Sequence, residues 1–139
     1  MSPTARSLGL LRREGYLAEV VEHWVPYGNV RRDLFGFGDI LAVHRSGRVL
    51  IVQATTRPNV SARLKKARSR TELACWLSAG CAFEVHGWFK NSNGRWECKR
   101  VDVKVTDGIL EAAARPTIRL KRRGKAKEKY AALWTAEAT

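Results

Sequence analysis

The stretch RRDLFGFGDILAVHRSGRVLIVQATT, residues 31–56, decides the fold of this chain. Its two apolar runs, ILAV and VLIV, flank a short polar turn and are typical of neighbouring buried strands. Polar residues nevertheless stand at one end of this predicted hairpin, with Asp39 before the first run and Gln53 and Thr55 after the second. Because a buried polar group is costly unless it is paired, we expect this end of the hairpin to serve a function.

The register of the hairpin depends on its turn. A three-residue loop over 45–47 places glycine at the third position, where a left-handed conformation is favoured. That loop pairs Leu41 with Ile51 and brings Asp39 opposite Gln53. A two-residue turn would instead put Asp39 and Gln53 on opposite faces of the sheet, so we expect the three-residue turn.

The composition predicts one basic domain. The chain has 139 residues, with 26 Lys and Arg against 13 Asp and Glu, and a net charge of +13. Such a charge predicts a polyanionic partner, most commonly nucleic acid, rather than a membrane surface. Three cysteines without metal-ligand spacing favour reduced thiols over zinc ligands or disulfides, so we expect a cytoplasmic protein of a bacterium, archaeon or phage-infected host.

The N-terminal part predicts a helix followed by a strand. Residues 4–14 have a helical pattern, with Thr4 as the cap and Gly15 as the end. Residues 16–24 are rich in β-branched and aromatic residues and favour a strand, although a continued helix is the alternative. Residues 25–33 are expected to form a loop.

The part after the hairpin completes a mixed α/β pattern. Residues 59–79 predict one helix or two, with an apolar side and a densely basic side. Residues 81–90 and 95–105 favour two strands, joined by a turn containing Asn93-Gly94. The order of helix, three strands, helix and two strands indicates a mixed sheet with helices packed on it.

The pattern weakens beyond Thr106. Residues 107–115 predict a short helix ended by Pro116, and residues 130–138 a terminal helix. We therefore divide the chain into a core domain, residues 1–106, and a basic C-terminal extension, residues 107–139.

The polar end of the hairpin resembles the PD-(D/E)xK nuclease superfamily. In that family an acid opens one strand, and an acid-x-lysine motif lies on the next. Gly38-Asp39 stands in the place of Pro-Asp, and Gln53-Ala54-Thr55 in the place of acid-x-lysine, with thirteen residues between Asp39 and Gln53. The order of elements is also similar over residues 4–90. Within this superfamily, the small size and basic charge of the chain are most similar to those of archaeal and phage Holliday junction resolvases.

This resemblance implies a restriction-endonuclease-like α-β-β-β-α-β core. It further implies an endodeoxyribonuclease that depends on Mg²⁺ or Mn²⁺ and is selective for branched DNA. A four-way junction has two scissile phosphates related by an approximate two-fold axis, so we expect a homodimer.

The resemblance also implies roles for individual residues. Asp39 and Gln53 would hold the metal ion, with Glu22 or Asp33 completing the site. Glu22 is a candidate because the predicted strand puts it on the face of Val20 and Trp24.

The catalytic lysine of the family is replaced by Thr55, and the family is known to move this lysine to the following helix. Lys66 is preferred there over Lys65, because Arg63 and Lys66 lie three residues apart on one helix face.

A second interpretation is a nucleic-acid-binding protein on a nuclease fold that no longer cleaves. Gln53 offers no charge to a metal, and Thr55 cannot act as a charged group. Both interpretations need a phosphate-binding surface. Its candidate residues are Arg31, Arg32, Thr55, Arg57, Arg63, Lys65, Lys66, Arg68, Arg70, Lys121, Arg122 and Arg123.

Overall fold

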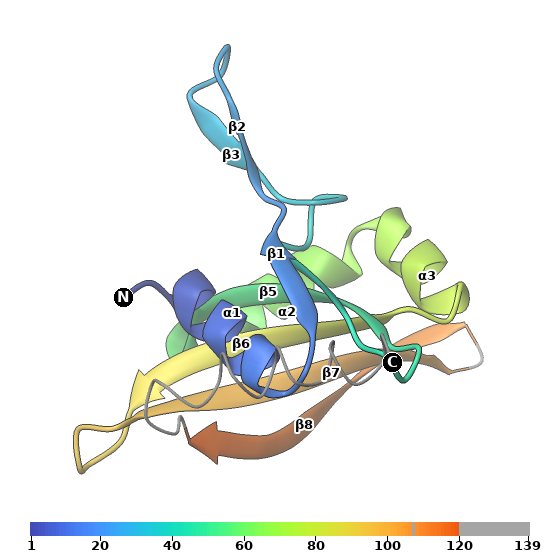
Figure 1. The fold of residues 1–139 in the computed structure, drawn as a ribbon. Coiled ribbons are helices and arrows are strands. Elements are labelled where there is room, and N and C mark those ends of the chain that lie inside the picture. Colours follow the sequence, from blue (N-terminus) through green and yellow to red (C-terminus); the bar gives the residue numbers. More distant parts are fainter. Residues whose placement is uncertain (107, 120–139) are drawn as a thin grey trace, which may run out of the picture.

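The chain folds around a six-stranded mixed β-sheet with helices on both faces (Figure 1). This computed structural model describes residues 1–106 and 108–119. The β5–β6 pair is parallel and the other neighbours are antiparallel, which confirms the predicted mixed α/β class. From edge to edge the strands are β1 (Leu17–Val20), β4 (Ile40–Val43), β5 (Val49–Thr56), β6 (Ala82–Lys90), β7 (Trp96–Thr106) and β8 (Ile109–Arg119).

Three helices cover the two faces of the sheet. Helix α1 (Pro3–Arg13) packs on one face, while α2 (Val60–Arg68) and α3 (Thr71–Ser78) pack on the other. A short 3₁₀ turn, η1 (Arg57–Asn59), and the two helices form the crossover that the parallel β5–β6 pair requires. The helices of the described residues are all too short or too polar to cross a membrane.

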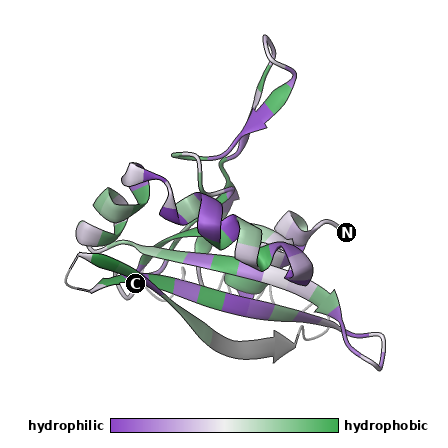
Figure 2. Ribbon diagram, turned by 180° about the vertical axis from the view of Figure 1, so that it is seen from behind, coloured by the Kyte–Doolittle hydropathy of each residue, from purple (hydrophilic) through white to green (hydrophobic). Residues whose placement is uncertain are grey.

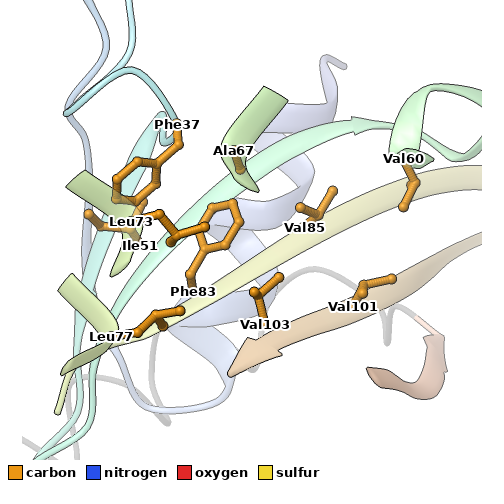
Figure 3. Packing of buried hydrophobic residues seen from close by; sticks show 10 residues of the cluster. All are labelled: Phe37, Ile51, Val60, Ala67, Leu73, Leu77, Phe83, Val85, Val101 and Val103. Carbon is orange, nitrogen blue, oxygen red and sulfur yellow. The ribbon is translucent and has the colours of Figure 1, made fainter. Parts of the chain in front are cut away.

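Strand β5 divides the core into two halves because its side chains alternate between the faces. Leu50 and Val52 pack with Leu11 of α1. Ile51 points to the opposite face, into the cluster beneath α2 and α3 that Figure 3 shows. Both faces of β5 are thus buried, and a polar residue here must be satisfied within the protein.

The predicted three-residue turn of the β4–β5 hairpin is confirmed. Gly47 has a φ of 97°, and the His44 amide donates to the Arg48 carbonyl at 2.8 Å. Leu41 pairs with Ile51, as the register required. The ladder continues one step beyond β4, so Asp39 and Gln53 come out on the same side of the hairpin.

The predicted strand over 16–24 is confirmed over β1 but does not continue to Trp24, and the loop predicted over 25–33 was wrong because it contains a further strand. Strand β1 ends at Val20, because its partner β4 begins at Ile40 and offers no further ladder. The chain then leaves the sheet as a separate antiparallel hairpin, β2 (His23–Val25) and β3 (Val30–Arg32), which projects from the body (Figure 1).

The helix boundaries differ in detail from the prediction. The cap of α1 is Ser2, whose hydroxyl accepts from the Ala5 amide at 3.1 Å, and not Thr4. The helix ends before Gly15, as predicted, and Gly15 has a φ of 92°. The segment 59–79 forms two helices, of the two options left open.

The short helix predicted over 107–115 was also wrong, because β8 begins at Ile109. Its alanines favour a helix locally, but pairing with β7 along its length outweighs that preference. The basic residues Lys121, Arg122 and Arg123 and the terminal helix predicted over 130–138 lie outside the described residues.

A buried polar network fixes α1 on the sheet. Arg100 of β7 is 1% exposed and donates to Glu84 at 2.8 Å and to Glu14, at the end of α1, at 2.7 Å. Ser7 of α1 lies 2.9 Å from Nδ1 of His86. Burial alone would raise the pKa of Glu84, but the hydrogen bond from His86 and the charge of Arg100 lower it, so Glu84 stays ionised.

Close packing requires glycine at position 38. A Cβ atom on Gly38 would lie 1.8 Å from Cγ2 of Ile51 in β5. The Gly38 amide also donates to the Leu34 carbonyl at 3.2 Å, which a proline at this position could not do. Gly38 therefore places Asp39 against β5.

We expect Gly38→Ala to lower the free energy of unfolding by about 2–3 kcal/mol, because the added methyl group overpacks the core. Urea denaturation measures this change. The matched control is Gly9→Ala in α1, where no described atom lies within 4 Å of the new Cβ, and stability should stay equal or rise by up to about 1 kcal/mol. Equal stability of the two variants would contradict the packing at Gly38.

Candidate functional site

The loop between β3 and β4 buries the aromatic ring of Phe37 in the core and directs its carbonyl group toward Gln53. Phe35 and Gly36 have positive φ angles of 54° and 79°, as the central residues of a type I′ turn do. This turn directs the Phe37 side chain into the core, where its ring centroid lies 5.2 Å from that of Phe83. The loop is therefore anchored by core packing on one side.

Asp39 is a buried acid at the start of β4. Its residue is 3% exposed, and its carboxylate accepts from the Ala54 amide of β5 at 3.2 Å. The hydroxyl of Thr4 lies 3.5 Å from Oδ2, so the first turn of α1 reaches the same group. Gln53 and Thr55 are also buried, each 5% exposed.

The side-chain amide of Gln53 lies between two carboxylates. One end of the amide is 3.3 Å from Oδ2 of Asp39. The other end is 3.0 Å from Oδ2 of Asp33 and 3.0 Å from the Phe37 carbonyl oxygen. Four oxygen-bearing groups, one from β5 and three from the segment between β3 and β4, therefore converge within a few ångströms.

The Gln53 amide cannot donate hydrogen bonds to the acceptors at both of its ends. An amide donates from its nitrogen only, so its oxygen must face either Asp39 or the pair formed by Asp33 and Phe37. The orientation that donates to Asp33 and Phe37 satisfies more acceptors, and it sets the amide oxygen against Asp39. Two oxygens at this separation need a proton or a cation between them.

The ionisation of the two acids follows from the same geometry. Burial raises the pKa of Asp39 to about 7; the charges of Asp33 and Glu22 act in the same direction, against the Ala54 hydrogen bond. Burial also raises the pKa of Asp33, opposed by the charges of Lys66 and Arg63. Near neutral pH the site can therefore hold a proton or exchange it for another cation.

Helix α2 supplies the basic groups of the site. Nζ of Lys66 lies 4.0 Å from Oδ2 of Asp33, and the charge of Arg63 acts on the same carboxylate. Lys65 is exposed, and Lys66 is the lysine whose charge lowers the pKa of Asp33. Of the two lysine candidates, the structure brings only Lys66 to the acids.

An open cavity of about 600 Å³ leads to Asp33. Four of its lining residues are Arg or Lys, and Asp33 is its one acid. The cavity lies between the β2–β3 hairpin, the loop before β4, and the ends of α2 and α3. Its lining residues are His23, Arg31, Arg32, Asp33, Phe35, Gly36, Lys66 and Arg70.

The remaining predicted residues are dispersed. Glu22 does not share a strand face with Val20 and Trp24, because it lies in the connection where the chain leaves the sheet; it pairs with Arg31 at 3.0 Å. Its charge still reaches Asp33 and Asp39.

Three of the predicted phosphate-binding residues lie apart from the acids or have other contacts. Arg57 stacks on the ring of Phe89 at 4.0 Å, and Arg68 is exposed on α2. Thr55 is buried, opposite Gly87 of β6.

The sequence prediction missed five contributors to the site. Thr4 was interpreted as a helix cap, and the carbonyl of Phe37 carries no side-chain signal. His23 lines the cavity from the β2–β3 hairpin, and Phe35 and Gly36 line it from the turn before β4. The paired glycines of the sequence LFGFG were the one available indication of a tight turn at this place.

Among the described residues, no group of three or more His, Cys, Asp and Glu side chains is placed to hold a metal ion. An ion at this site would take Asp33, Asp39 and neutral oxygens from Gln53 or the Phe37 carbonyl. Such hard oxygen donors are those that Mg²⁺ and Mn²⁺ prefer, and Mg²⁺ commonly needs only one or two carboxylates. The donor set therefore fits a divalent ion of this type.

A second cluster, on the α1 face, resembles a hydrolytic triad in geometry only. Ser7 lies 2.9 Å from His86, and His86 lies 3.2 Å from Glu84. All three residues are 0% exposed, and Trp88 donates to the Ser7 hydroxyl at 2.8 Å. Since no substrate can reach Ser7, this cluster is structural.

Comparisons of the chain with protein-family models, curated proteins and solved structures each gave no match. The geometry of the site therefore carries the functional interpretation.

Asp39→Asn should change the pH dependence of stability. The native pKa near 7 lies above the unfolded value, so the wild-type free energy of unfolding falls between about pH 4 and 7 as the buried carboxylate ionises. Relative to wild type, the free energy of unfolding of the variant should rise by a few kcal/mol across this range, since one pKa unit corresponds to about 1.4 kcal/mol. Thermal or urea unfolding at pH 4, 6 and 8, without divalent metal, measures it.

The control for this experiment is Glu19→Gln, which removes an acid whose side chain is 77% exposed. Its stability relative to wild type should stay nearly constant with pH. A constant difference between Asp39→Asn and wild type would show that Asp39 is not a strained buried acid.

Proposed function

We propose that this chain is a Mg²⁺- or Mn²⁺-dependent nuclease acting on DNA, with its active site at Asp33, Asp39, Gln53 and Lys66. The observation that carries this proposal is the Gln53 amide held between the buried carboxylate of Asp39 and the partly buried carboxylate of Asp33. Placing two acids and a neutral amide so close together is costly for the fold, and a bound cation would relieve that cost. The basic cavity beside Asp33 fits a polyanionic substrate.

The arrangement of elements supports the same proposal. Helix α1, the antiparallel strands β1, β4 and β5, helix α2 and the parallel strand β6 follow in the order α-β-β-β-α-β. This is the order that the PD-(D/E)xK resemblance implies. We therefore propose a restriction-endonuclease-like core, with the β2–β3 hairpin inserted between its first two strands.

Asp39 and Asp33 would hold the metal ion together with the oxygen of Gln53. A bound divalent ion lowers the pKa of a water molecule and screens charge on the phosphate. Asp39 can serve as a ligand only when deprotonated, and its pKa near 7 makes ion binding compete with a proton. Metal binding should therefore strengthen as the pH rises through 7.

Lys66 is the group that would stabilise charge at the reacting phosphate. Its ammonium lies 4.0 Å from Asp33 and is partly exposed on the cavity side. It can therefore turn to an incoming phosphate oxygen, where a fixed positive charge favours the transition state. Arg32 and Arg70 would hold neighbouring phosphates and align the scissile bond.

A second candidate function is nucleic-acid binding without cleavage. It is favoured by Gln53, which brings no negative charge to a metal, and by Thr55, which stands where the family has its lysine. This function needs the basic cavity but not the acids. It predicts salt-sensitive binding and no metal-dependent product.

Branched DNA and a homodimer remain part of the proposal. A dimer with two-fold symmetry would present two Asp39 sites to the two scissile phosphates of a four-way junction. Light scattering at micromolar concentration should then give about twice the chain mass of 15.7 kDa, alone or with junction DNA. A single-chain mass under both conditions would exclude the dimer and weaken the junction assignment.

The central test is cleavage of labelled four-way junction, duplex and single-stranded DNA with Mn²⁺, Mg²⁺ or chelator. We expect metal-dependent cleavage that Asp39→Asn reduces at least 100-fold while DNA binding is kept. Lys66→Ala should lose about 100- to 1,000-fold, as when one transition-state donor is removed. Lys65→Ala is the matched control on the same helix and should cleave nearly as wild type.

Three results decide between the proposals. Wild-type cleavage by Asp39→Asn would show that the site assignment is wrong. Equal losses in Lys65→Ala and Lys66→Ala would indicate only general phosphate binding. No cleavage of any substrate, with binding retained, would establish the second candidate function.

A further inference from the structure

The β2–β3 hairpin exposes aromatic side chains that the fold does not use. Tyr27 in its turn is 101% exposed, and Trp24 on β2 is 55% exposed. The hairpin projects away from the sheet and from α1 (Figure 1), so these rings take no part in the hydrophobic clusters of the described residues. Exposed rings on a projecting element are typical of a binding surface.

The hairpin is held in shape by its own contacts. Trp24 pairs across the strands with Arg31, which places both side chains on one face. The Gly28 amide donates to the Val25 carbonyl at 3.3 Å and closes the turn. Because the rings are presented on a paired β-hairpin, little backbone entropy is lost on binding.

Positive charge surrounds the base of the hairpin. His23, Arg31 and Arg32 line the basic cavity that leads to Asp33. Figure 2 shows hydrophilic and hydrophobic residues together along the hairpin. Cations that can bind phosphates thus lie beside rings that can stack, and this combination recognises single-stranded nucleic acid.

The hairpin is also close to the proposed active site. Strand β3 ends at Arg32, and Asp33 is the next residue. The three residues of β3 extend roughly 10 Å away from Asp33, at about 3.3 Å per residue. This length corresponds to about three base steps of 3.4 Å along one strand.

We propose that Trp24 and Tyr27 stack on unpaired bases of DNA, about three bases from the phosphate that lies at Asp33. The inference rests on the proposed function, since the substrate is the same nucleic acid, and it specifies the part of the substrate that is recognised. A duplex hides the faces of its bases, so these residues select single-stranded or branched DNA. They contribute little to the binding of continuous duplex.

The test compares ring-removing with ring-keeping substitutions in the full chain. Trp24→Leu and Tyr27→Leu remove a ring but keep an apolar side chain, whereas Trp24→Phe and Tyr27→Phe keep a ring. Affinity is measured by fluorescence anisotropy with a labelled single-stranded oligothymidylate and with a labelled duplex of equal length. Stacking is measured separately, by the fluorescence of 2-aminopurine in a single strand.

Each Leu variant should bind the single strand about tenfold more weakly, the loss expected for one stacked base. Duplex affinity should change less than twofold. The Phe variants should bind the single strand nearly as tightly as wild type. Wild type should change the fluorescence of 2-aminopurine fully, and each Leu variant should change it less. Ile109→Ala, at a site that is 63% exposed on β8, is the control for an apolar surface change and should have no effect.

Several outcomes would overturn the inference. Leu variants with wild-type single-strand affinity, or with equal losses on single strand and duplex, would show that the rings do not read bases. Leu variants that turn a dimer into a monomer without affecting stacking would make the hairpin a contact between chains. Absence of any DNA binding by wild type would overturn this inference and the proposed function together, whereas stacking without metal-dependent cleavage would overturn only the nuclease.

Discussion

The three-residue turn over 45–47 sets which residues of β4 and β5 face each other, and the contacts of the site depend on that register. It brings the Asp39 carboxylate within 3.2 Å of the Ala54 amide and within reach of the Gln53 amide. A shift by one residue would turn Gln53 toward α1 and break up the site. The apolar core enforces the register, since the same shift would move Ile51 out of the cluster beneath α2 and α3.

The arrangement of Asp33, Asp39 and Gln53 is electrostatically unfavourable for the folded state. Two acids with raised pKa values lie against one neutral amide, and of these three groups Asp39 and Gln53 are buried. Core packing makes this possible, because the ring of Phe37 and the close approach at Gly38 hold the loop in position. Stability obtained on one side of the loop is thus offset by electrostatic cost on the other.

The sequence predicted those features that depend on short-range patterns. The apolar runs and Gly47 were sufficient for the β4–β5 register, and the spacing of Arg63 and Lys66 indicated the face of α2 that meets Asp33. It failed where a distant partner decides the outcome. Strand β1 stops because β4 does, and the alanines of β8 are extended because β7 pairs with them.

The position of a backbone carbonyl could not be predicted from residue types at all. Phe37 reads in the sequence as an ordinary core aromatic, and its ring is one. Its carbonyl reaches Gln53 only because the preceding turn has two positive φ angles. Sequence patterns report side-chain chemistry, whereas such a site also uses main-chain atoms.

The buried network under α1 has a consequence for the order in which the chain becomes folded during synthesis. Helix α1 is made before the sheet that it covers, yet Glu14 at its end pairs with Arg100, 86 residues later, and its Ser7 meets His86, 79 residues later. A helix of 11 residues is only marginally stable in water by itself. Its apolar side can pack on β1, β4 and β5 earlier, but the polar network can form only after β6 and β7 have left the ribosome.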